Sequence, residues 1–228
     1  AADRLLPWVV PAYLALVFAL GGPTVDVTAR DEWLQLAALP VLLLAGIPLL
    51  LDPPRARLTR AAMVAALAIA CVPLLQLLPL PSWLWGMPDA RAALALDLAN
   101  AGVDAPSRWS LHPEATLRSL LALLPALACF FGVVALGPHR LKRLPQVLVG
   151  LVLANIAFGF LQVSLPPGSG LRLYPGLGSG FGGVLVNDNH QGTALLIGMV
   201  LALGLWAGAR ARAHAAQGRP PKLRNGFW

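Results

Sequence analysis

Long apolar runs separated by short polar segments dominate the pattern of this chain. A helix needs about 20 apolar residues to cross a hydrocarbon core of ~30 Å. Six runs approach that length, so the pattern predicts an all-α, polytopic bundle of about six transmembrane spans. The first run is the shortest and contains Pro11, but we keep it as a span, because Asp3 and Arg4 make a weak basic head for a signal peptide and no A-x-A site follows. The predicted spans lie near residues 7–20, 34–51, 61–80, 117–136, 145–165 and 193–209.

Segments rich in Lys and Arg alternate along the chain with segments that contain few of them. Cytoplasmic loops are enriched in Lys and Arg, so this alternation predicts both termini in the cytoplasm and the loops 81–116 and 166–192 outside. Residues 1–209 then form the membrane bundle, and 210–228 form a basic cytoplasmic tail that we interpret as a truncated linker. The basic residues assigned to the cytoplasm are Arg4, Arg55, Arg57, Arg60, Arg140, Lys142, Arg143, Arg210, Arg212, Arg219, Lys222 and Arg224.

Composition narrows the class of protein further. The chain is 57% hydrophobic and 12% charged, whereas soluble domains average roughly 25% charged residues. Disorder and an ordinary soluble domain are both excluded by this balance. The net charge of +7 follows membrane topology, so lipid is an expected partner and nucleic acid is not. Cys71 and Cys129 lie inside apolar runs, so we expect no disulfide framework and no zinc site. The sequence contains no Walker or Rossmann pattern, so we expect no cofactor.

Three amides interrupt the predicted spans. Gln76, Asn155 and Gln162 would be costly against lipid, so each is expected to face another helix or a polar cavity. Contact between helices is the simplest role for them.

The first outer loop contains aromatic and helix-capping signals. Trp83 and Trp85 are predicted to anchor the chain at the lipid headgroups. Asp89 is expected to cap a short helix through Ala99 that stops at 100–102. Ser110 is predicted to cap the fourth span, and His112 to have a capping or packing role. Arg118 either extends to the interface or meets an anion in an outward cavity.

The second outer loop is rich in glycine and ends in five polar residues, 187–191, directly before the sixth span. Arg172 is its single basic residue. A guanidinium group together with the outward amino end of a helix suits a phosphate-bearing ligand. Asn187, Asn189 and His190 are therefore candidate ligand contacts. The alternative is that Asn187 or Asn189 only caps the helix.

Several motifs, in this order, resemble the O-antigen ligase and polymerase-like family. They are Gln76-Leu-Leu-Pro-Leu-Pro81 with Trp85, then Trp109-Ser-Leu-His-Pro-Glu-Ala-Thr116, then Arg172 and Asn187-Asp-Asn-His190. The resemblance covers about residues 76–205. Members usually have about twice as many spans and a later outer loop with a catalytic histidine that has no counterpart here. The resemblance thus implies the amino-terminal part of such a protein.

The resemblance implies a function at the outer face of the bacterial inner membrane. Such proteins transfer a glycan from an undecaprenyl-diphosphate carrier to a glycan or lipid acceptor without a metal. Arg172 would contact the diphosphate, and Asn187, Asn189 and His190 would shape the glycan site, while the catalytic residue stays unknown. A repeat-unit polymerase and, from a different class, a small six-span transporter are the alternatives.

Overall fold

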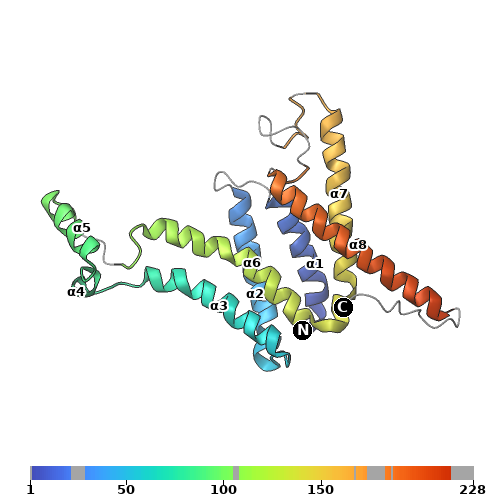
Figure 1. The fold of residues 1–228 in the computed structure, drawn as a ribbon, viewed down its shortest axis with the longest axis horizontal. Helices are drawn as coiled ribbons and strands as arrows, with labels where there is room; N and C mark the ends of the chain where they lie inside the picture. Colours follow the sequence, from blue (N-terminus) through green and yellow to red (C-terminus); the bar gives the residue numbers. More distant parts are fainter. Residues whose placement is uncertain are drawn as a thin grey trace, which may run out of the picture. The chain divides into compact units, whose positions relative to one another are not determined.

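A computed structural model describes residues 2–21, 29–104, 108–166, 168–173, 183–185 and 187–216. The described residues are helical apart from turns, connecting segments and one isolated antiparallel bridge between Pro79 and Arg108. Figure 1 shows the elements. In chain order they are α1 (Ala2–Leu20), α2 (Ala29–Leu51), α3 (Arg57–Leu77), α4 (Ser82–Trp85), α5 (Asp89–Asn100), α6 (Pro113–Arg140), the 3₁₀ turn η1 (Leu141–Arg143), α7 (Leu144–Ser164) and α8 (Asp188–Ala216).

Five helical segments in the described part are long and apolar enough to cross a membrane. The first predicted span differs, because its apolar helix, Arg4–Leu20, is shorter and rises only about 25 Å. The described residues therefore support an all-helical, multi-pass membrane protein with five span-capable helices, and the sixth span stays a prediction. Those five segments are Ala29–Leu51, Arg57–Leu77, Pro113–Gly137, Leu141–Ser164 and Asn189–Ala216.

The chain divides into two compact units. The first contains α1, α7 and α8, together with residues up to Leu34 and from Leu136 onward. Within it α7 packs against α8, and the Tyr13 hydroxyl donates a hydrogen bond to the Leu34 carbonyl over 2.9 Å. The second unit, Gln35–Ala135, contains α3, α4 and α5 with most of α2 and α6.

In the second unit, the end of α3 is joined to the segment before α6. The Ser110 amide donates to the Gln76 carbonyl over 2.8 Å. Trp85 is only 3% exposed, and its indole Nε1 donates to the Arg108 carbonyl at 2.8 Å. The predicted headgroup anchor at Trp85 is therefore wrong, because this ring is covered by protein. Trp83, in contrast, is 70% exposed.

The helix ends in this unit are capped partly as predicted. The short helix α5 is confirmed, but the residue at its N-cap is Pro88, with no side-chain cap bond, so the Asp89 cap is wrong. His112 is confirmed as a capping residue, since its Nδ1 accepts the Ala115 amide at 3.2 Å. The Ser110 hydroxyl oxygen instead accepts the His112 amide at 3.1 Å, so Ser110 supports the cap without being one.

Candidate functional site between α7 and α8

One face of α7 combines apolar and polar buried residues. Val152, Asn155, Gly159 and Gln162 are buried along this helix, and their spacing of three and four places them on a single face. The helix is otherwise strongly apolar. Two buried amides on the packed face of such a helix need specific partners, because lipid supplies none.

Asn155 obtains its partners from α8 and from the segment before it. Its side chain is 2% exposed, and Nδ2 donates to Gln191 Oε1 at 2.8 Å. Its Oδ1 accepts the Val184 amide at 2.8 Å. The backbone of Gly183, at φ +58°, lies so close that a Cβ there would collide with the Asn155 carboxamide. This contact requires glycine at 183.

Gln162 and Arg172 hold the segment that follows α7 against the end of the helix. Gln162 Nε2 donates to the Leu171 carbonyl at 3.0 Å. The Arg172 guanidinium folds back along the chain, and its Nη2 donates a hydrogen bond to the Leu165 carbonyl at 2.6 Å. Arg172 is therefore half-buried beside the carboxyl end of α7. We refer to Asn155, Gln162, Arg172 and Gln191 together as the polar seam.

Two buried donors of the polar seam have no hydrogen-bond partner among the described residues. They are Arg172 Nε and Gln191 Nε2. Leaving a buried donor unpaired costs about 1–3 kcal/mol. Both groups are N–H donors, so a ligand that pairs with them must carry several oxygen atoms that accept hydrogen bonds. Asn155 lies next to Gln191, and Gln162 lies near Arg172, and these two α7 residues are separated by roughly 10 Å along the helix.

The asparagines before α8 follow the helix-capping alternative. Asn187 Oδ1 accepts the Asn189 amide at 2.9 Å, and the Asn187 carbonyl accepts the Gln191 amide at 2.9 Å. The Asn189 and His190 residues are exposed on the first turn of α8. The side chain of Asp188 and the glycine-rich residues 174–182 lie outside the described residues.

Arg118 does not share this unit. It lies on α6 in the second unit, where its Nη2 is 3.9 Å from Glu114 Oε2, and the two side chains are 69% and 80% exposed. An exposed pair of this kind contributes at most about 1 kcal/mol. The structure thus brings Arg172 next to the α7 end and places the predicted Asn187, Asn189 and His190 on the α8 start, but it leaves Arg118 in a surface ion pair.

Sequence reasoning missed the partnership of Asn155 with Gln191. Asn155 and Gln162 were expected to face another helix or a polar cavity, which their burial confirms, but neither was assigned to the site. Their seven-residue spacing was the available signal, because it places two polar residues on one helix face. Within the described ranges, no group of three or more His, Cys, Asp or Glu side chains could hold a metal ion.

Comparisons with family models, curated proteins and solved structures find no match to this chain. The interpretation of the site therefore depends on its residues and their geometry.

Proposed function

We propose that this chain is a six-span part of an inner-membrane glycosyltransferase of the O-antigen ligase type, with both ends of the chain in the cytoplasm. The donor is a glycan linked to a polyprenyl diphosphate, and the acceptor is a second glycan or a lipid at the outer face. Arg172 and Gln191 bind the diphosphate in this proposal. Asn189 and His190 contact the glycan, and Asn187 orders the helix start that carries them.

The distribution of basic residues supports the orientation. Arg140, Lys142 and Arg143 precede α7, and Arg210 and Arg212 lie near the end of α8. By the positive-inside rule these ends face the cytoplasm. The opposite ends, where α7 stops and α8 begins, then face outward. The polar seam includes residues near those ends, with Gln162 on the last turn of α7 and Gln191 on the first turn of α8.

The observation that carries the proposal is the pair of unpartnered buried donors, Arg172 Nε and Gln191 Nε2. A diphosphate offers many anionic oxygens, and charge-assisted hydrogen bonds to it are stronger than neutral ones. The amino end of α8 adds a partial positive charge to the same region. A polyprenyl tail also matches a site that lies between two apolar helices.

The chemistry that these donors support is stabilisation of a leaving group. An acceptor hydroxyl attacks the anomeric carbon of the donor sugar and forms the new glycosidic bond. The bond from that carbon to the diphosphate oxygen breaks, and the diphosphate leaves with the electron pair. Donors placed at the departing oxygens lower the barrier, because negative charge accumulates there. The base that takes the hydroxyl proton is not assigned to a residue of this chain.

Two substitutions test the proposal in the intact gene product in its native cell. Arg172→Ala and Gln191→Leu each remove one donor, and surface glycan attachment is expected to fall at least tenfold, with weaker binding of a short-chain polyprenyl diphosphate to the purified protein. Arg108→Gln is the matched control, because it removes an exposed arginine from the other outer loop. Normal glycan attachment and unchanged diphosphate binding in both variants would overturn the proposal.

A further inference from the structure

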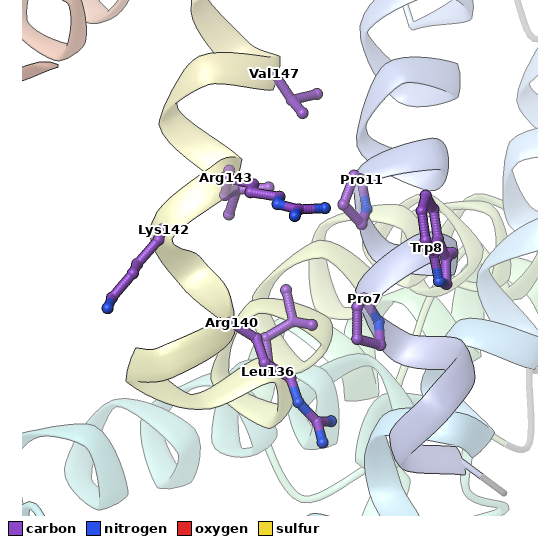
Figure 2. Close-up of a pocket in the computed structure, with 9 residues that line it drawn as sticks. Pro7, Trp8, Pro11, Leu136, Arg140, Lys142, Arg143 and Val147 are labelled. Atoms are coloured by element: carbon purple, nitrogen blue, oxygen red, sulfur yellow. The ribbon is translucent and has the colours of Figure 1, made fainter.

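A cavity lies in the first unit, at the opposite end of α7 from the polar seam. It occupies about 400 Å³ between the first turns of α1 and the junction of α6 with α7 (Figure 2). Its walls are largely apolar and include Pro7, Pro11, Leu136 and Val147. All of its lining residues belong to this one unit.

The cavity combines apolar walls with positively charged side chains. Figure 2 shows the Arg143 guanidinium extending across the cavity toward Pro11, while Arg140 lies near Leu136 at its edge. Lys142 also belongs to the lining, but its side chain points away. No acidic residue is among the described lining residues. This combination fits a ligand that has both an anionic and an apolar part.

The position of the cavity along the helices identifies the source of such a ligand. Arg140 lies between the span-capable segments Pro113–Gly137 and Leu141–Ser164, and Arg143 is the third residue of the second segment. Charged residues at the ends of spans lie at the level of the lipid headgroups. Trp8, which lines the cavity and is 73% exposed, has the amphipathic ring that is favoured at this level.

We infer that this cavity is a binding site for one anionic glycerophospholipid. The lipid phosphate pairs with Arg143, Arg140 adds positive charge at the edge of the cavity, and the first part of an acyl chain lies along Pro11 and Val147. Basic pockets between transmembrane helices bind anionic headgroups by the same charge complementarity. A free phosphate ion would use the arginines alone and leave the apolar walls without a role. This inference does not depend on the proposed glycan transfer.

Lipid titration of the purified full chain, followed by native mass spectrometry, tests the inference. Phosphatidylglycerol and phosphatidylcholine with identical acyl chains are the two probes, and phosphatidylglycerol is expected to occupy one site preferentially. Arg143→Gln should weaken its binding about fivefold, the effect of one basic residue near a lipid surface. Val147→Phe should also weaken binding, because the larger ring fills the cavity without changing charge.

Arg60→Gln is the matched control, since Arg60 is an exposed arginine of another basic segment that does not line the cavity. It should leave phosphatidylglycerol binding unchanged, and helicity by circular dichroism should show that all variants fold. Equal binding of the two lipids, or unchanged binding in both cavity variants, would overturn the inference. Displacement of phosphatidylglycerol by excess inorganic phosphate from the wild type and from Val147→Phe alike would assign the site to a free anion and also overturn it.

Discussion

Asn155 illustrates how one polar side chain is accommodated in an apolar helix. Both ends of its carboxamide are paired, one with Gln191 and the other with the Val184 amide. Its inward orientation was predictable, because lipid cannot satisfy an amide. Its partners were not predictable, because they depend on how the segment before α8 folds back on α7. Periodicity along a chain contains no information about that path.

Replacing Asn155 should therefore destabilise the contact between α7 and α8. Asn155→Leu removes the hydrogen bonds that Asn155 makes with Gln191 Oε1 and the Val184 amide, and the free energy of unfolding is expected to fall by about 1–2 kcal/mol, the usual range for polar contacts between membrane helices. Denaturation by sodium dodecyl sulfate in mixed micelles measures this change. Ala157→Leu is the control on an exposed position of the same helix, and equal stability of the two variants would contradict the prediction.

At the scale of elements, the apolar runs predicted where the long helices lie better than they predicted the residues at which those helices begin and end. The run at 193–209 predicted the last span, yet α8 extends over Asp188–Ala216. The asparagine cap starts the helix earlier, and Arg210, whose guanidinium carbon lies 5.3 Å from the centroid of the Trp206 ring, continues it beyond the apolar run. Residues 217–228 of the predicted tail lie outside the described residues. Polar residues can extend a helix without contributing to an apolar pattern.

Two of the four glycines of α8, Gly198 and Gly204, provide a matched test of helix packing. A Cβ on Gly198 would lie 2.8 Å from Val152 Cγ1 and 3.1 Å from both Val152 Cβ and Cγ2, whereas one on Gly204 would meet nothing within 4 Å. Because valine is stiff at χ1, it cannot move aside easily. Gly198→Ala should lower the free energy of unfolding by about 1–3 kcal/mol.

Gly204→Ala should be neutral or slightly stabilising, since alanine restricts the unfolded chain by about 0.4–1 kcal/mol. The same denaturation assay compares the two alanine variants. Similar stability for both would mean that α7 and α8 do not approach closely at Gly198.

A second prediction at this scale concerns the segment between α3 and α6. Arg91 Nη2 donates to the Trp109 carbonyl at 2.6 Å, and its guanidinium carbon lies 5.4 Å from the centroid of the Trp85 ring. Arg91→Gln should remove both contacts and increase amide hydrogen exchange in the backbone near Trp85 and Trp109. Amide exchange in α7 should not change. If exchange near Trp85 and Trp109 were the same in the variant as in the wild type, this role for Arg91 would be refuted.

For the whole molecule, the sequence predicted an all-helical, multi-pass chain, and the described helices support that class. The first span is the difference, since Arg4–Leu20 is shorter than the other five. Pro7 and Pro11 lie inside this helix, and apolar content alone does not determine whether a short helix crosses a bilayer. The grouping of α1 with α7 and α8 was also not predictable, because contacts between distant helices leave no periodic pattern in the sequence.

Reporter fusions test the topology directly. A cytoplasmic fluorescent reporter placed after Lys142 should be active, and a periplasmic phosphatase placed after Gly170 should be active, because the basic residues flanking α7 favour that orientation. A reporter at the amino terminus tests α1, with cytoplasmic activity expected if this helix spans. Phosphatase activity after Lys142 would reverse the orientation on which the proposed function depends.

The hydrogen bond from the Ser110 amide to the Gln76 carbonyl has a consequence for how this protein can be re-engineered. Since these two backbone groups meet, Leu77 and Trp109, the residues next to them in the chain, also lie close together. A linker of a few residues should bridge that gap and preserve the register of the two flanking helices. The segment between Leu77 and Trp109 is thus a natural place to excise a module, or to graft another, while α3 and α6 are retained.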